Sequence, residues 1–337
     1  MVRFGIVGTG RISDWVLKGA VLDFRFKAVA VCSRSADSAR AFVDAHPQVF
    51  GKDFLIFTSV GEMAACREID AIYIGTPNST HFQYTMEALN GGKHVLCEKP
   101  LACSADEVRQ MAEAAKRNGR CLMEAMISTL NPNFIAATDL VGSLGHVWHY
   151  SSSFCQYSSK YDALKAGTVS NSFNPLMGGG ALADIGIYTT FPALRLFGRP
   201  SDVKSSLIRY STQYGDTDVQ GCINLEYPGM TASLAFSKVV DSRLQTEICA
   251  EGGNVLLDAV HICRKVTFAP HAAPTSGRGR ITEPEVICEG LGRDEYYYEF
   301  REFIDVIESG RTESSVNTLE LSILNREIMD VVLKQAR

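Results

Sequence analysis

The chain has 337 residues, of which 46% are hydrophobic and 21% charged, and its formal net charge is -5. This length exceeds a typical domain of roughly 100–200 residues, so we expect two domains. An acidic chain without a long basic run, in which no apolar stretch reaches roughly 18 residues, predicts neither nucleic acid nor a membrane as a partner.

Residues 1–124 alternate short apolar runs with helical segments. This alternation predicts a parallel sheet that helices cover on both faces. The expected strands are Val2–Val7, Lys27–Cys32, Ile56–Thr58, Ala71–Ile74, His94–Cys97 and Cys121–Glu124, and the expected helices begin near Ser13 and after the capping residues Ser35, Ser79 and Ser104, the last with Glu107 in a capping box.

The pattern changes in residues 125–337, which we expect to form a second α/β domain around a large, open, mostly antiparallel sheet. Several strands there follow one another without intervening helices, and such strands are expected to pair antiparallel. A Pro-, Gly-, Ala- and Ser-rich stretch at 270–280 predicts an exposed loop. The expected strands are His146–Phe154, Val203–Tyr214, Val219–Tyr227, Thr231–Phe236, Gln245–Ala250, Asn254–Leu257 and Lys265–Phe268, and the expected helices follow Asn131-Pro132 or span about Gly180–Leu196, Asp294–Glu308 and Asn317–Lys334.

The run Gly8-Thr9-Gly10-Arg11-Ile12-Ser13 follows the first strand and opens a helix. It fits G-x-G-x-x-[G/A], with serine as the small third residue. Such glycines allow a tight turn and close approach of a pyrophosphate, which the helix N-terminus attracts. We therefore predict a Rossmann domain over 1–124 in which Gly8, Gly10, Arg11 and Ile12 bind a dinucleotide. A tight turn without a ligand is the ordinary alternative.

The second strand ends in Val31-Cys32-Ser33-Arg34, without the carboxylate that would bind the ribose 2′-hydroxyl of NAD. Ser33 can hydrogen-bond a 2′-phosphate, and Arg34 can pair with it and stack on adenine. We predict NADP as the preferred cofactor and NAD as the alternative. An ordinary solvated surface arginine would also explain Arg34.

Two further runs follow strands four and five, at the carboxyl edge where ligands bind in open α/β folds. Thr76, Pro77, Asn78 and His81 follow the fourth strand, and we predict that they contact the cofactor or substrate. A half-exposed histidine in a helix's first turn would explain His81 equally well.

Glu98-Lys99-Pro100 ends the fifth strand, and we predict that Glu98 and Lys99 lie at the cofactor. A surface ion pair is the ordinary explanation of such residues. A lysine at this edge would, however, face the nicotinamide and the reacting oxygen, where an ammonium can stabilise a developing alkoxide.

Three glycines, Gly178 to Gly180, precede a helix that carries Asp184 and Tyr188. These two residues are spaced i and i+4, so they share one helix face. A carboxylate can orient a substrate hydroxyl, and a tyrosine can act as general acid or base where a cation such as Lys99 stabilises its phenolate. We predict that the three side chains converge on one substrate carbon. Local capping by Asp184 and ordinary packing by Tyr188 remain equally open.

Taken together, these motifs resemble those of the glucose–fructose oxidoreductase / inositol dehydrogenase (Gfo/Idh/MocA) family. The resemblance covers essentially the whole chain. It implies a Rossmann domain and a C-terminal domain whose open sheet commonly makes a dimer through its outer face. The matching runs are Gly8-Thr9-Gly10, His94 to Leu101 and Gly178 to Tyr188.

By this resemblance, Lys99 matches the active-site lysine of the family and Asp184 its substrate-binding carboxylate. Pro100 matches a proline whose preceding peptide is usually cis. Tyr188 stands where many members have histidine, which is similar to the NADP-preferring dihydrodiol/xylose dehydrogenase branch. Thr129 stands where that branch usually has arginine.

We therefore predict an NAD(P)-dependent enzyme that transfers a hydride between a nicotinamide and a sugar, polyol or related substrate. The open sheet predicts a homodimer, or a tetramer built from dimers. Two alternatives remain: a sugar–sugar oxidoreductase with a tightly held nucleotide, and a catalytically silent NADP-binding regulator of the same fold.

The beginning of the chain reads as a strand rather than a charged and apolar leader, so we expect no signal peptide and a cytoplasmic location. Ten cysteines are scattered along the chain and form no CxxC pair. We expect reduced thiols rather than a disulfide framework or a metal site.

Overall fold

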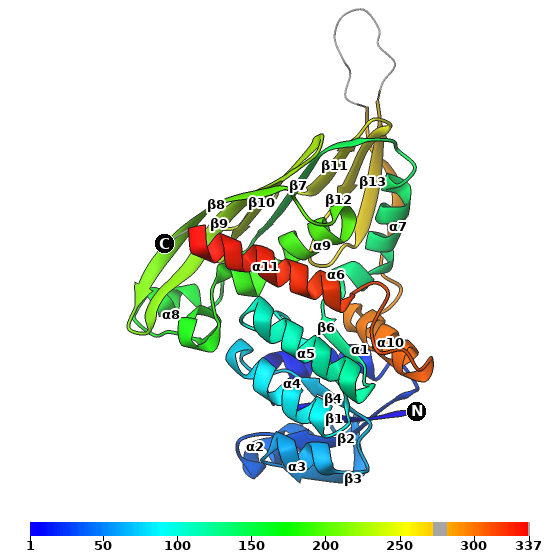
Figure 1. Cartoon of the computed structure of the whole chain (residues 1–337), viewed down its shortest axis with the longest axis vertical. Coiled ribbons are helices and arrows are strands. Elements are labelled where there is room, and N and C mark those ends of the chain that lie inside the picture. The colour runs from blue at the N-terminus through cyan, green and yellow to red at the C-terminus, as the bar shows by residue number, and fades with distance from the viewer. Residues whose placement is uncertain (272–281, 336–337) are drawn as a thin grey trace, which may run out of the picture. The chain divides into compact units, whose positions relative to one another are not determined.

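The structure, a computed structural model, describes residues 1–271 and 282–335 (Figure 1). The chain divides into two units, Met1–Ile127 with Arg293–Arg326 and Ser128–Gly292 with the part that follows from Glu327. The domain bounds 1–124 and 125–337 stay a prediction. Of the loop predicted at 270–280, residues 272–280 lie outside the described part of the chain.

A six-stranded sheet in the order β3-β2-β1-β4-β5-β6 forms the centre of the first unit. Every neighbouring pair in it is parallel. This order is that of dinucleotide-binding folds, so the predicted Rossmann architecture is confirmed. The strands are β1 (Val2–Val7), β2 (Phe26–Cys32), β3 (Phe50–Phe57), β4 (Ala71–Ile74), β5 (His94–Glu98) and β6 (Leu122–Ala125).

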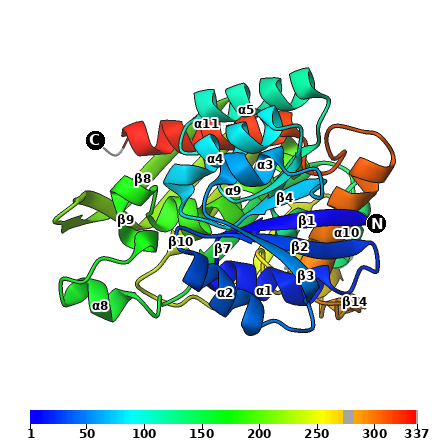
Figure 2. The same ribbon diagram turned by 90° about the horizontal axis from the view of Figure 1, so that it is seen from below.

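Helices cover both faces of this sheet (Figure 2). Ser35 and Ser104 cap helices as predicted, and Glu107 completes the capping box. The prediction for Ser79 is wrong, because Ser79 lies inside a short 3-10 turn, Asn78–Thr80, and Thr80 is the residue before the next helix. The helices are α1 (Arg11–Ala20), α2 (Ala36–Asp44), α3 (Val60–Ala65), α4 (His81–Asn90), α5 (Ala105–Asn118) and α10 (Glu295–Glu308), and α11 (Leu319–Gln335) begins in this unit.

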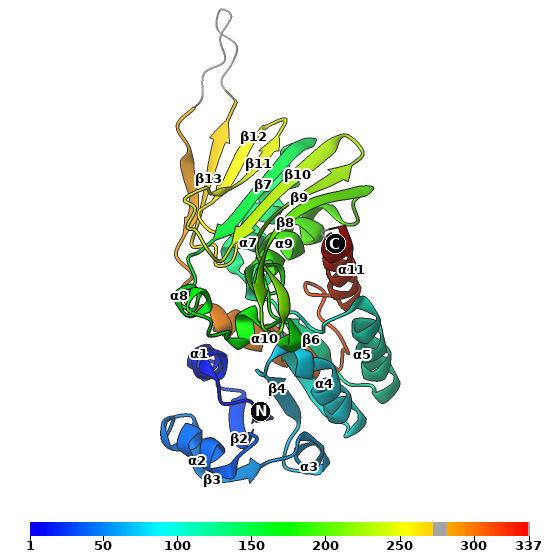
Figure 3. The same ribbon diagram turned by 90° about the vertical axis from the view of Figure 1, so that its left-hand side faces the viewer.

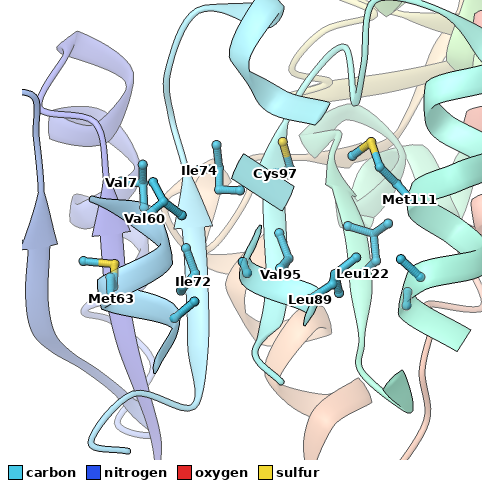
Figure 4. Close-up of a cluster of buried hydrophobic side chains, with 14 of the residues drawn as sticks. Val7, Val60, Met63, Ile72, Ile74, Leu89, Val95, Cys97, Met111 and Leu122 are labelled. Atoms are coloured by element: carbon cyan, nitrogen blue, oxygen red, sulfur yellow. The ribbon is translucent and has the colours of Figure 1, made fainter. Parts of the chain in front are cut away.

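The sheet core explains why these strands could be recognised. All residues of β4 and of β6 are buried, as expected for strands that are covered on both faces. Apolar side chains of the sheet gather against α3, α4 and α5, and fully burying one such side chain contributes about 1.5–3 kcal/mol. Figure 4 shows part of this cluster, including Val7, Ile72, Ile74, Val95 and Leu122.

The second unit contains an eight-stranded sheet in the order β14-β13-β12-β11-β7-β10-β9-β8 (Figure 3). The predicted mostly antiparallel sheet is confirmed. Antiparallel pairing of β10 with β11 does not occur, because β7 lies between them and pairs parallel with β10. The strands are β7 (Val147–Cys155), β8 (Asp202–Thr212), β9 (Gly215–Tyr227), β10 (Met230–Ser237), β11 (Thr246–Ala250), β12 (Gly253–Leu257), β13 (Lys265–Pro270) and β14 (Glu285–Glu289).

One face of this sheet packs on helices α7 (Pro132–Val141) and α9 (Ile187–Phe197) (Figure 1). Asn131 caps α7, and a π turn, Leu182–Gly186, leads into α9. The helices α6 (Ile127–Leu130) and α8 (Tyr161–Lys165) are short. No helix in the described part of the chain has the length and hydropathy needed to cross a membrane.

Half-buried side chains alternate with fully buried ones along the central strands of the second unit. In β7, Tyr150 and Ser152 are buried, whereas Ser151 and Ser153 are half-buried. Ser151 and Ser153 pair with Ser233 and Ala235 of β10, so these four share the opposite face. We call this set the outer sheet face. These four side chains are small and uncharged, and Glu247 of β11, which pairs with Ser151, borders them.

Candidate active site

The glycine loop after β1 lies against the loop after β4. Gly8 has a φ of +99°, which favours glycine, and its amide donates to the carbonyl oxygen of Cys32 at 3.0 Å. A Cβ at this position would overlap the carbonyl oxygen of Gly75. The Gly75 amide in turn donates to the carbonyl oxygen of Val7 at 2.8 Å. Only a residue without a side chain fits at Gly8.

The space in front of Gly10 suits a phosphate group. Gly10 is the residue before α1, and a Cβ built there meets no described atom within 4 Å. Amide groups of the first helical turn point toward such a position, and the helix dipole favours an anion there. Arg11 is exposed and Ile12 half-buried beside it. These residues therefore fit the pyrophosphate of a dinucleotide.

Hydroxyl groups and a guanidinium gather at the end of β2. The Ser33 Oγ lies 3.5 Å from the Thr9 Oγ1 of the glycine loop, and Arg34 is exposed next to it. The Ser35 hydroxyl accepts a hydrogen bond from the Ser38 amide. The arrangement offers donors and a positive charge, so it fits a ribose 2′-phosphate.

His81 ties two loops of the first unit together. Its Nδ1 lies 2.9 Å from the carbonyl oxygen of Pro100, and its Nε2 lies 2.9 Å from that of Thr76. The ring is fully buried, and this burial lowers the pKa of His81. The histidine is thus enclosed rather than half-exposed. Asn78 and Pro77 remain half-buried at the surface of the same turn.

Two buried carboxylates hold the turn that carries Lys99. Glu98 accepts the Tyr73 hydroxyl at 2.7 Å and the Lys99 amide at 3.3 Å, and burial raises the pKa of Glu98. Glu124 accepts the Leu101 amide at 2.9 Å, and burial raises its pKa to about 7. The Lys99–Pro100 peptide is cis, as the resemblance implied, and Lys99 is half-buried. The main chain on both sides of Lys99 is therefore fixed.

In the second unit, the triple glycine fits tightly against β9. Gly180 has a φ of +140°, and a Cβ there would overlap the Asp218 carboxylate. The other oxygen of Asp218 accepts the Leu182 amide at 2.6 Å. Asp218 is buried, and this burial raises its pKa. The carboxylate thereby anchors the start of the helical segment that carries Asp184.

Asp184 lies in the π turn before α9, and turns of this kind are frequent at functional sites. Its Oδ2 lies 2.6 Å from the Nζ of Lys238. The Asp184 side chain is 37% exposed, whereas that of Lys238 is 3% exposed. Asp184 therefore pairs with a residue distant in sequence, and Ala181 rather than Asp184 is the residue before the turn.

Tyr188 lies beside a pair of stacked rings. Phe154 of β7 and His261 stack with ring centres 4.0 Å apart and planes 5° from parallel. The Tyr188 ring meets both edge-on, at 5.7 Å and 6.2 Å. Burial lowers the pKa of His261 to about 4, so this histidine is neutral at pH 7. The aromatic contacts hold the tyrosine, which is itself half-buried.

Three side chains near the predicted residues were missed from the sequence: Asp218, Lys238 and His261. Lys238 does follow an apolar strand directly, as Lys99 does, and this pattern could have indicated it. Asp218 and His261 belong to no motif. Thr129, which stands where the resembling branch has arginine, is buried in α6 and 1% exposed.

Family models and known proteins match this chain over most of its length. A family model described as "Oxidoreductase family, NAD-binding Rossmann fold" matches residues 2–126, and a "GFO/IDH/MocA C-terminal domain" model matches residues 140–256. A scyllo-inositol 2-dehydrogenase (NADP(+)) of Bacillus subtilis is 38% identical over 335 residues, which cover 99% of this chain and 97% of that protein.

A further relative and a solved structure are less similar in sequence. A trans-1,2-dihydrobenzene-1,2-diol dehydrogenase of Xenopus laevis is 28% identical, over 99% of this chain and 97% of that protein. The crystal structure of a 3-ketoreductase from Actinomadura kijaniata with NADP and TDP-benzene superimposes with a TM-score of 0.82 at 22% identity, covering 100% of this chain and 98% of that one. This last likeness concerns the fold.

Proposed function

Because the chain belongs to the Gfo/Idh/MocA family of nicotinamide-dependent oxidoreductases, we propose that it oxidises one hydroxyl of a cyclic polyol with NADP. The predictions of the family, the enzyme class and the nicotinamide cofactor are confirmed. The observation that carries the substrate proposal is the 38% identity, along 99% of the chain, to a relative named scyllo-inositol 2-dehydrogenase (NADP(+)).

Different residues at the edge of the Rossmann sheet bind different parts of the nucleotide. Gly8 and Gly10, with Arg11 and Ile12, hold the pyrophosphate at α1. Ser33 and Arg34 bind the 2′-phosphate. They favour NADP over NAD because both side chains can donate hydrogen bonds to this phosphate and Arg34 adds a positive charge. Thr76, Pro77 and Asn78 line the turn after β4 at the same edge. Bound NADP supplies the hydride acceptor for the oxidation.

Three side chains act on the substrate. Asp184 accepts a hydrogen bond from a hydroxyl next to the reacting carbon and so orients the ring. Tyr188 in its phenolate form takes the proton of the reacting hydroxyl and becomes a neutral phenol as the carbon loses its hydride. The Lys99 ammonium stabilises the negative charge on the phenolate and on the substrate oxygen. Glu98 and His81 support this step by fixing the turn from which Lys99 extends.

The same proposal includes assembly and location. A homodimer, or a tetramer built from dimers, would form through the outer sheet face, whose four small and uncharged side chains allow two sheets to approach closely. A cytoplasmic location would keep the ten cysteines, all of them free thiols, in the reduced state.

A substrate panel tests the proposed function. It would contain scyllo-inositol, myo-inositol, D-xylose, D-glucose and a trans-dihydrodiol, each with NADP and separately with NAD, and NADPH or NADH absorbance would be followed. We expect inositols with NADP to give the highest kcat/KM. Turnover confined to aldoses or dihydrodiols would overturn the cyclic-polyol assignment. Oxidation of one sugar coupled to reduction of another, without added nucleotide, would instead indicate a tightly held cofactor.

A further inference from the structure

The buried ammonium of Lys238 is the starting point of this inference. Lys238 directly follows β10 and is 3% exposed, although lysine is among the residues least often buried. Its Nζ lies 2.6 Å from the Asp184 carboxylate and donates to the carbonyl oxygen of Ser172 at 2.7 Å. The Phe173 ring centre lies 4.0 Å from the same nitrogen. A carboxylate, a carbonyl group and an aromatic face thus surround the charge.

The pair between Lys238 and Asp184 is unequal in exposure. Solvent reaches 37% of the Asp184 side chain, so the carboxylate is the member that a ligand can contact. The lysine lies behind it in the protein interior. An ammonium in this position is costly unless it is paired, and the carboxylate supplies the pairing charge. The arrangement therefore holds Asp184 from behind and leaves contact with a substrate to the carboxylate.

We infer that Lys238 is a positioning residue for Asp184, which it keeps ionised and oriented so that the carboxylate accepts hydrogen bonds from substrate hydroxyls. This inference rests on the proposed function, in which Asp184 binds the substrate. An ionised carboxylate accepts hydrogen bonds but donates none. The substrate must therefore present hydroxyl groups at this point, as a polyol does, and a carboxylate or phosphate there would be repelled.

Two other charged groups act on this neighbourhood from adjacent strands. Asp218 of β9 is buried, and the positive charge of Lys238 opposes the rise that burial causes in its pKa. Arg209 of β8 acts on Asp218 in the same direction. Loss of Lys238 would remove positive charge from both carboxylates, Asp184 and Asp218, and so favour their protonated forms. Substrate binding should then weaken first at acid pH.

The test compares Lys238→Met and Lys238→Arg with a matched control, Lys93→Met. Lys93 is also a buried lysine, whose Nζ donates to the carbonyl oxygens of Cys66 and Ile69 at 2.6 and 2.8 Å, but it lies in the first unit. For each purified protein, the thermal midpoint, NADPH affinity, KM, kcat and the pH profile of kcat/KM would be measured. The assay uses scyllo-inositol or, if it is not turned over, the best substrate of the panel.

We expect Lys238→Met to raise KM by about tenfold or more, because a hydrogen bond to a charged group is lost, while kcat changes by less than about threefold. The acid limb of kcat/KM should move to higher pH. Lys238→Arg should restore most of the affinity, and Lys93→Met should lower the thermal midpoint with KM and the acid limb unchanged. The inference would be overturned if Lys238→Met lowered the thermal midpoint but kept the KM of the parent and the acid side of its kcat/KM profile.

Asp184→Asn separates this inference from the proposed function. A parental KM in Asp184→Asn would mean that Asp184 does not bind substrate, and the proposed function would fail. A raised KM in Asp184→Asn without one in Lys238→Met would refute the inference alone. The double variant removes both charges and also serves if a single variant does not fold. In it, Lys238→Met should raise KM by less than about twofold beyond Asp184→Asn alone, because Lys238 acts through Asp184. A full independent loss would contradict this.

Discussion

The His94 Nδ1 accepts a hydrogen bond from the Cys121 amide at 2.9 Å, and this contact joins the start of β5 to the residue before β6. The Arg120 Nη1 lies 3.5 Å from the other ring nitrogen. Burial and the positive charge of Arg120 lower the pKa of His94 to about 4. Protonation would remove the acceptor and place two positive charges side by side.

This contact predicts a stability that depends on pH. The folded pKa of about 4 lies below the unfolded value of about 6.5, so the contribution of His94 is complete above pH 6.5 and is lost as the pH falls toward 4. His94→Asn keeps an acceptor that does not titrate. Between pH 7 and pH 5, the parent should lose about 1 kcal/mol relative to His94→Asn, with allowance for solvent screening. Denaturant unfolding at pH 7 and pH 5 measures the free energy of unfolding of both proteins. If the parent and His94→Asn differed by the same amount at both pH values, this prediction would be refuted.

The two glycines of the first loop should respond differently to alanine. Gly8→Ala meets a positive φ and the Gly75 carbonyl group, so we expect a loss of at least about 2 kcal/mol in the free energy of unfolding. Gly10→Ala meets no described atom, so its stability should stay within about 0.5 kcal/mol of the parent. Its NADP affinity should nevertheless fall by about tenfold or more, because the methyl group occupies the position of the pyrophosphate. Calorimetry and nucleotide titration distinguish the two, and unchanged NADP binding in Gly10→Ala would argue against the proposed pyrophosphate position.

Arg34 should determine the choice of nucleotide. Removing its charge in Arg34→Ala should weaken NADP binding by about tenfold or more, as expected for a charge-assisted pair with the 2′-phosphate, and leave NAD binding nearly unchanged. Arg40→Ala is a suitable control, because Arg40 is also exposed and its guanidinium lies over the Phe54 ring. Fluorescence titrations with both reduced nucleotides would measure the effect. An equal loss for the two nucleotides would be inconsistent with 2′-phosphate recognition.

The outer sheet face should control assembly. Ser233→Arg places a long charged side chain at the centre of that face, and we expect it to convert the dimer or tetramer into a monomer. Gln48→Arg, at an exposed position of the first unit, should leave the assembly unchanged. Sedimentation at micromolar concentration measures both. A monomeric parent protein, or an unaltered Ser233→Arg assembly, would show that this face is not the interface.

Much of the first unit could be predicted from the sequence because its determinants are local. A strand such as β4 is a continuous apolar run, and the turn at Lys99 is marked by its proline and by the adjacent glutamate. The edge strand β14 was not predicted, because its residues are mostly exposed and carry no alternating pattern. β3 was predicted too short for the same reason, since its first half is mainly polar and exposed.

The rest of the second unit depends on contacts between distant parts of the chain. The parallel pairing of β7 with β10 follows from a long connection between them, and no local pattern encodes it. The same holds for the ion pair between Asp184 and Lys238, whose members come from different elements. The sequence could place Asp184 and Tyr188 on one helix, but the stacked rings beside Tyr188 depend on His261, far along the chain.

The central claim is that Lys99 and Tyr188 together carry the proton transfer that accompanies hydride transfer. The most direct measurement is single-turnover oxidation of the best polyol by the parent, Lys99→Met, Tyr188→Phe and the double variant, each saturated with NADP. We predict that each single variant binds NADP like the parent but reacts about 10²–10⁴ times more slowly, and that the double variant is little slower than either. Rates near that of the parent in both single variants would contradict the account.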